Sequence, residues 1–290
     1  SEDFSYLIDL GLPTRYESSA FNLDPEIKRE VVWSGPIMRP ATVLVKRKRA
    51  LVELRGTSSR RDSWENFENA LRPYESVLTE VLDPVRAPEL VAVREQIRSW
   101  RFYDQFRTDV DSPVRQSQIG TRTPVLDGDG RDLAAALETI IEIGEADALI
   151  DTIDDAFPGS RLQVVETRGR FDLELYAHGL LRPLSAAELS DGTLRYLLLV
   201  AALLSPRPPS LMVLNEPETS LHVDLLPALA RLIAAARERT QIVVVTHARE
   251  LVNALTDAGA EPLRLVKDFG ATTVEGVDRL EQPPWNWGSR

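Results

Sequence analysis

A carboxylate and an amide stand at the end of an apolar run near the middle of the C-terminal half. Residues 211–214 are all apolar, and Asn215 and Glu216 follow them directly before Pro217. In α/β proteins, catalytic groups gather where buried parallel strands end, because the adjoining loops open there. The pattern therefore predicts a reactive carboxylate at Glu216, although a residue that only caps the next helix has the same spacing.

A second polar loop, Leu189-Ser-Asp-Gly-Thr193, precedes a helical pattern over residues 191–204. The N–H groups and the dipole of a helix start attract phosphate, and a serine hydroxyl next to a glycine lets an anion approach closely. The loop therefore predicts phosphate contacts by Ser190, Asp191 and Gly192. Simple capping of the helix by Ser190 or Asp191 is the alternative.

Two histidines accompany these loops. His247 follows Thr246 and the apolar run of residues 242–245, so it stands at the end of the next predicted strand. His222 lies six residues after Glu216, in Glu218-Thr-Ser-Leu-His222. A histidine at a strand end is often structural, so type alone does not assign either residue a chemical role.

The spacing of apolar residues predicts the strands and helices that position these residues. Alternating and β-branched runs predict an antiparallel sheet from strands over residues 4–10, 26–32, 42–45 and 51–54, with turns at 34–36 and 49–50. Spacings of three and four predict helices over residues 62–82, 88–101, 131–143 and 146–157. The aromatics of residues 100–103 are expected to anchor this helical region to the sheet. A hairpin is predicted from strands over residues 161–166 and 171–175.

The C-terminal part alternates strands with helices. Helices are predicted over residues 191–204, 224–237 and 248–258, and strands over 211–214, 241–245, 263–268 and 272–277. Apolar runs without alternation indicate strands buried on both faces, and hence a parallel sheet covered by helices. Residues 283–287 are expected to pack as an extended arm. The predicted fold class is α/β, with an antiparallel β part at 1–60, a helical insert at 61–160 and a chemistry-bearing lobe at 161–290.

The composition limits which partners and which cellular location the sequence predicts. The net charge of −11 disfavours nonspecific binding to nucleic-acid phosphates. The basic patch Lys46-Arg-Lys-Arg49 opposes that sign locally, or forms a solvated turn between two strands. The sequence contains no cysteine, no signal-peptide pattern at its start and no apolar run long enough to span a membrane. These features predict a cytoplasmic protein without a membrane partner.

Together the motifs resemble the ATPase core of the ABC/SMC/RecF-like superfamily, and especially the stand-alone bacterial AAA-type ABC-like ATPases. The resemblance implies a P-loop NTPase core with ATP and Mg²⁺ as cofactors. Residues 211–216 resemble a Walker B strand, in which Glu216 polarises the attacking water. Asn215 stands where the family has aspartate, and would reach Mg²⁺ through water.

The other motifs also find counterparts in this superfamily. Residues 189–193 resemble the signature motif, so Ser190, Asp191 and Gly192 would serve the nucleotide held by the opposite protomer. His247 resembles the switch histidine that contacts the γ-phosphate, and His222 resembles part of the D-loop. The resemblance thus implies a head-to-tail homodimer, with a protein or DNA partner at the helical insert.

The phosphate-binding P-loop of the superfamily is missing, because the sequence contains no Gly-Lys pair. One expectation is that this segment lies upstream in a longer ATPase or is carried separately. The other is a non-hydrolysing scaffold, or a nucleic-acid or defence-complex binding module, that retains the fold. The presence of the signature, Glu216 and His247 favours the first.

Overall fold

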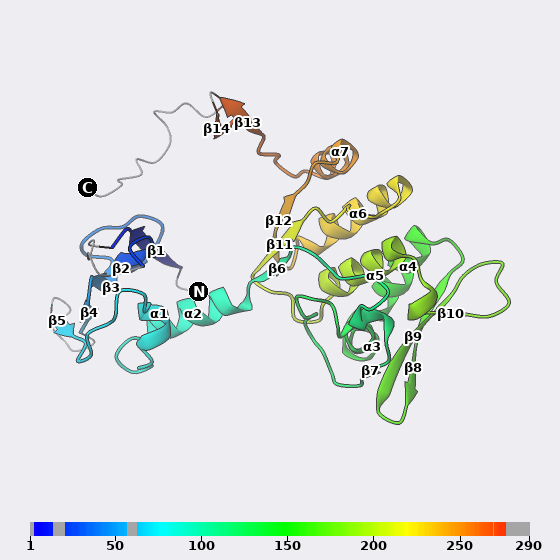
Figure 1. Ribbon diagram of the computed structural model, residues 1–290, viewed down its shortest axis with the longest axis horizontal. Coiled ribbons are helices and arrows are strands. Elements are labelled where there is room, and N and C mark those ends of the chain that lie inside the picture. The colour runs from blue at the N-terminus through cyan, green and yellow to red at the C-terminus, as the bar shows by residue number, and fades with distance from the viewer. Residues whose placement is uncertain (1–2, 14–20, 57–62, 269, 277–290) are drawn as a thin grey trace. The chain divides into compact units, whose positions relative to one another are not determined.

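The computed structural model describes residues 3–13, 21–56, 63–268 and 270–276 (Figure 1). The chain forms two compact units, divided between Arg98 and Ser99: unit 1 precedes this point, and unit 2 runs from Ser99 to Gly276. The predicted division at residues 60 and 160 stays a prediction. No helix within the described ranges is long and apolar enough to cross a membrane.

Unit 1 is built on a five-stranded antiparallel sheet whose strands follow chain order. These strands are β1 (Phe4–Gly11), β2 (Glu26–Ser34), β3 (Val43–Lys48), β4 (Leu51–Arg55) and β5 (Trp64–Asn66). Inward-facing residues of the sheet, such as Val32, Val45 and Leu54, are buried together with apolar residues of α1 (Val77–Glu80) and α2 (Pro88–Ser99). The four predicted strands and the turns at Gly35 and Arg49 are confirmed.

The helix predicted over residues 62–82 is wrong. Trp64–Asn66 is a strand paired with β4, and only the four residues of α1 are helical. Pro73 accounts for the interruption, because proline has no amide to donate and disfavours helical backbone in the preceding residue. Its carbonyl accepts a 2.7 Å hydrogen bond from the N–H of Ile27, which holds this irregular segment against β2.

The centre of unit 2 is a parallel sheet in the order β12–β11–β6. Its strands are β6 (Arg101–Tyr103), β11 (Leu211–Asn215) and β12 (Gln241–Val245). Met212 and Leu214 are fully buried against apolar residues of the helices α5 (Asp191–Leu203), α6 (Leu226–Ala236) and α7 (Arg249–Asp257). The predicted strand–helix alternation is confirmed here, and with it the α/β fold class.

β6 has no counterpart among the predicted elements. With three residues it is too short to show a period. Tyr103 anchors β6 within unit 2, since its ring is buried and its hydroxyl donates to the carbonyl of Leu126 at 2.9 Å. The strand pairs in parallel with β11, so both strands end at the same edge of the sheet.

The remainder of unit 2 packs around α5, in which residues 194–203 are all buried. The predicted helices and hairpin are confirmed as α3 (Leu133–Ile143), α4 (Ala146–Ala156), β8 (Arg161–Thr167) and β9 (Arg170–Tyr176). Short connections are formed by β7 (Gln118–Ile119), β10 (Leu184–Ser185), and the 3-10 turns η1 (Pro113–Arg115), η2 (Ala186–Glu188) and η3 (Val223–Leu225). β13 (Leu265–Asp268) pairs with β14 (Ala271–Val274), as predicted. The arm expected at residues 283–287 lies outside the described residues.

Candidate functional site

Glu216 lies directly after β11, in an uncommon backbone conformation. Its φ angle is +44°, in the left-handed region, which costs a residue with a side chain about 1–2 kcal/mol. Its N–H donates to the carbonyl of Val245 at 2.7 Å, and its own carbonyl accepts from Thr219 N–H at 3.1 Å and from Arg195 Nη2 at 2.9 Å. Backbone strain that is held in place by several hydrogen bonds occurs mostly at functional sites.

Arg195 is a site residue that sequence reasoning missed. It lies on α5 and is 6% exposed, yet its guanidinium reaches the carbonyls of Glu216 and Pro217. Burial lowers its pKa, and the charges of Glu218 and Glu216 oppose that shift. The available signal was a single charged residue inside the otherwise uncharged run of residues 194–204. A buried cation in that run requires acceptors nearby.

Glu216 and His247 face each other across two neighbouring strand ends. Val245 pairs with Asn215, so the residues that follow these two strands leave the sheet at the same edge. His247 Nε2 lies 3.7 Å from Glu216 Oε1, and the two side chains are 87% and 48% exposed. An exposed pair of this kind adds little stability. It leaves both groups open to a ligand.

The signature-like loop begins α5. Ser190 Oγ accepts from Thr193 N–H at 3.1 Å and lies 2.8 Å from the Thr193 hydroxyl, which makes Ser190 the N-cap of the helix. Gly192 lies against the backbone that follows Glu216: a Cβ at this position would stand 2.5 Å from the carbonyl oxygen of Ser220. Glycine is therefore required here by close approach and not by its own φ angle.

Asp191 bonds to a second buried arginine. Arg115 Nη2 donates to Asp191 Oδ1 at 2.6 Å, and Arg115 Nη1 donates to the carbonyl of Leu189 at 2.7 Å. The Arg115 side chain is 10% exposed, whereas that of Asp191 is 58% exposed. Arg115 thus holds the loop of residues 189–193 in place and partly neutralises the carboxylate of Asp191.

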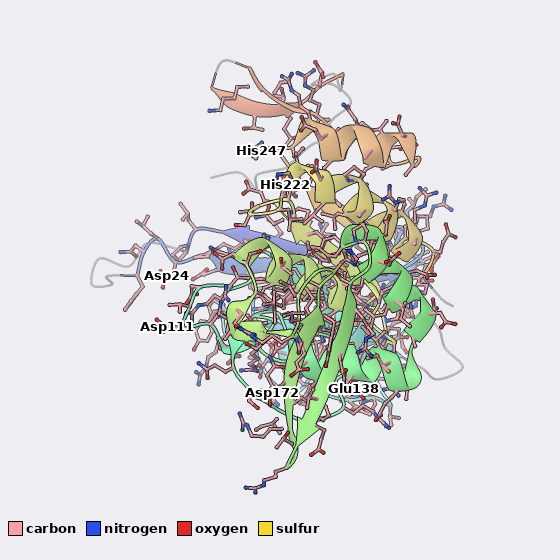
Figure 2. The ribbon with its side chains drawn as sticks, turned by 90° about the vertical axis from the view of Figure 1, so that its right-hand side faces the viewer. Asp24, Asp111, Glu138, Asp172, His222 and His247 are labelled. Atoms are coloured by element: carbon pink, nitrogen blue, oxygen red, sulfur yellow. The ribbon has the colours of Figure 1, made fainter. Side chains whose placement is uncertain are left out.

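His222 lies beside the same loop, as the N-cap of η3. Its Nδ1 accepts from Asp224 N–H at 3.3 Å, and the side chain is 72% exposed (Figure 2). A surface hollow is lined by Ser190, Asp191, Gly192, Ser220 and His222 among others. Four of the residues predicted to bind nucleotide therefore share one depression.

A second hollow lies at the end of β11. It is lined by Asn215 and Glu216, together with Asp191, Arg195 and a loop that follows β6. That loop contributes Asp104, which sequence reasoning missed because β6 itself was not predicted. Leu214 pairs with Tyr103, so Asn215 and Asp104 are the next residues on adjacent parallel strands. The predicted site residues other than His247 thus line two hollows, and His247 lies beside Glu216, outside both linings.

A comparison with known proteins identifies a family for this chain. A family described as "AAA domain, putative AbiEii toxin, Type IV TA system" matches residues 2–253. Among curated proteins, none matches this sequence.

Several similar solved structures are heads of SMC proteins. The SMC head domain from Thermotoga maritima is 13% identical, with a TM-score of 0.40 over 87% of this chain and 75% of its own. An SmcHead bound to the C-winged helix domain of ScpA is 12% identical, with a TM-score of 0.46 over 86% and 74%. The Smc head with a coiled coil and joint from Pyrococcus yayanosii is 16% identical, with a TM-score of 0.40 over 50% of this chain. The chain covers 28% of the length of that protein.

The predicted membership of an AAA-type ATPase family is confirmed by the family match. The family match spans both units and includes every predicted site residue, from Ser190 to His247. The chain therefore belongs to this family of AAA-type ATPase domains.

Proposed function

We propose that this domain hydrolyses ATP in a head-to-tail dimer, once it is joined by a phosphate-binding loop that its own sequence lacks. The observation that carries the proposal is the Glu216–His247 pair. An exposed carboxylate and an imidazole lie 3.7 Å apart past the ends of two parallel strands, next to a helix N-terminus. A group that polarises water and a group that contacts a phosphate oxygen need this proximity.

The donor set near Glu216 suits Mg²⁺. The hollow at the sheet edge offers the amide oxygen of Asn215 and the carboxylates of Glu216 and Asp104. Mg²⁺ prefers oxygen ligands and retains several waters, so one or two protein donors and the substrate phosphates are sufficient. When bound, the ion would neutralise charge that develops on the transferred phosphoryl group.

The signature-like loop suits a phosphate supplied by a second copy of the chain. α5 is 13 residues long and carries a helix dipole, and its first turn has no side chain at Gly192. Ser190 and Gly192 line a different hollow from Asn215 and Glu216. A head-to-tail dimer would place the first hollow of one protomer over the second hollow of its partner.

The roles of the individual side chains follow from these positions. Glu216 would orient the attacking water and accept its proton, and His247 Nε2 would hydrogen-bond to the γ-phosphate. Arg195 holds the backbone of Glu216 from behind, so the carboxylate does not need to reorganise when substrate binds. Binding of the β- and γ-phosphates would depend on the added loop, because the sequence has no Gly-Lys pair.

The parallel sheet itself favours a further covering segment. Opposite the buried Met212 and Leu214, the residues Phe102, Val243 and Val245 are 53%, 43% and 46% exposed. Parallel sheets are stable when both faces are covered. A strand–loop–helix segment that carries a P-loop would cover this face and bring phosphate-binding groups to the edge with Glu216.

The missing Gly-Lys pair also favours a second candidate function. A scaffold, or a nucleic-acid or defence-complex binding module, would retain the fold without turnover. The net charge of −11 argues against nonspecific DNA binding as its main activity.

Complementation between two inactive variants tests the proposal. In the P-loop-bearing protein, Ser190→Arg and Glu216→Gln should each abolish hydrolysis. A mixed dimer then contains one composite site with both defects and one with neither, so mixing should restore about a quarter of the wild-type rate by random pairing. A wild-type protein without hydrolysis would favour the scaffold. Hydrolysis that mixing does not restore would overturn the shared site.

A further inference from the structure

Glu218 connects the turn after β11 to the loop that carries His247. Its Oε1 accepts three hydrogen bonds from the other segment: from the Thr246 hydroxyl at 2.6 Å, from His247 N–H at 3.2 Å and from Ala248 N–H at 3.3 Å. The two segments are separated by 28–30 residues in the sequence. One carboxylate oxygen therefore sets where the backbone of His247 lies.

Glu218 holds the segment just before α7, whose N-cap Ala248 has a methyl side chain that cannot accept from the free N–H groups of the first turn. Glu218 Oε1 accepts from the N–H groups of His247 and Ala248, which precede the helix, and its negative charge is favourable at a helix N-terminus. Ala248 N–H also donates to Thr246 Oγ1 at 3.0 Å. The position of His247 thus depends on a residue of the turn and not on its own helix.

The turn is also held from the opposite side. Arg195 of α5 donates to the carbonyls of Glu216 and Pro217, so the turn is fixed between α5 and α7. Glu218 Oε2 is buried and has no hydrogen-bond partner among the described residues. An unsatisfied buried carboxylate oxygen is costly, and capping alone does not explain why a carboxylate is present here.

We propose that Glu218 is a positioning residue, which ties the loop of His247 to the turn of Glu216 and so sets the separation of those two side chains. The hydrogen bonds of Glu218 carry the claim that it positions the loop. The effect of this positioning on catalysis rests on the proposed ATPase function. Two experiments test the positioning and its catalytic effect separately.

The first arm measures amide exchange and histidine spectra in the 290-residue chain. In Glu218→Ala, the amides of His247 and Ala248 should exchange about tenfold faster, while buried α5 amides keep their rates. The chain has three histidines, so the imidazole signals of His247 can be resolved and should shift while those of His178 stay. Glu218→Gln retains an oxygen acceptor and should recover most of the protection.

Asp83→Ala is the matched control for this arm. Asp83 Oδ1 accepts from the backbone N–H groups of Val85 and Arg86 at 3.0 and 2.9 Å in unit 1. Its loss should leave the signals of His247 unchanged. Unaltered exchange at His247 and Ala248 in Glu218→Ala would overturn the positioning role, whatever the enzyme does.

The second arm measures ATP hydrolysis by the P-loop-bearing protein. Glu218→Ala should lower kcat at least about tenfold with KM within about twofold, because misplacement affects the reacting geometry more than binding. Glu218→Gln should recover most of kcat, and Asp83→Ala should retain it. Lost amide protection with an unchanged kcat would overturn the catalytic consequence. A wild-type protein without hydrolysis would contradict the proposed function, and the first arm would still decide the contact.

Discussion

At the scale of single residues, the site depends on groups held under constraint. Glu216 has a positive φ angle, and Val245, Thr219 and Arg195 hold its backbone, so the start of its side chain is fixed before any ligand binds. This preorganisation supports chemistry more than stability, because the Glu216–His247 pair is exposed.

Glu216→Gln tests that carboxylate directly. The amide keeps the shape and hydrogen bonding but loses the charge that polarises water, so turnover should fall at least about 100-fold. ATP-driven association of the P-loop-bearing protein should persist. Phosphate release and size-exclusion chromatography check the two effects. Hydrolysis at the wild-type rate would show that Glu216 serves only the turn.

Gly192→Ala tests the packing of the signature-like loop without reference to any function. The new Cβ would stand 2.5 Å from the carbonyl oxygen of Ser220, so one backbone segment must move, at a cost of about 1–3 kcal/mol. Gly128→Ala is the control, since nothing lies within 4 Å of its Cβ position. Thermal unfolding should show a lower Tm for the first variant alone, and equal Tm values would refute the close approach.

At the scale of elements, unit 1 is held together by a buried ion pair. Arg47 of β3 and Glu30 of β2 are both fully buried, with Nη1 and Oε2 2.7 Å apart. Glu30 also accepts from the Ser76 hydroxyl and from Val77 N–H at the start of α1. The sequence interpretation of Arg47, as part of a basic patch or of a solvated turn, is therefore wrong, because its guanidinium is paired with Glu30 inside unit 1.

Arg47→Met should destabilise unit 1 by about 3–5 kcal/mol, because it leaves the carboxylate of Glu30 buried without its counter-charge. The double variant Arg47→Met with Glu30→Leu should regain much of that loss. Arg86→Ala, which removes an exposed pair with Glu65, should change stability by less than about 1 kcal/mol. Urea unfolding followed by circular dichroism measures all three. Equal effects of the two arginine variants would contradict the buried pair.

At the scale of the whole molecule, the absence of a Gly-Lys pair from the sequence predicts weak nucleotide binding. The 290-residue chain should bind MgATP with a Kd above about 100 μM, because it has neither a P-loop lysine nor its nest of N–H groups. Isothermal calorimetry checks this, with the P-loop-bearing protein as the positive control. Micromolar affinity of the chain alone would require a phosphate site elsewhere.

The sequence by itself determined the strand–helix alternation of residues 191–258 and the residues at its strand ends. These features are local: apolar runs have the lengths of buried strands and helices, and Asn215, Glu216 and His247 directly follow them. Each side chain could be assigned to a strand end from the sequence, whereas the pairing of β11 with β12 that brings Glu216 and His247 together comes from the structure.

Only the tertiary structure decided which distant groups hold that site. β6 is too short to show a period, and Pro73 overrides the helical spacing of the segment around it. Arg195, Glu218 and Arg47 were missed or misread because their partners lie 17 to 30 residues away. The cost of burying a charge depends on what the fold places beside it, and spacing along a chain does not contain that information.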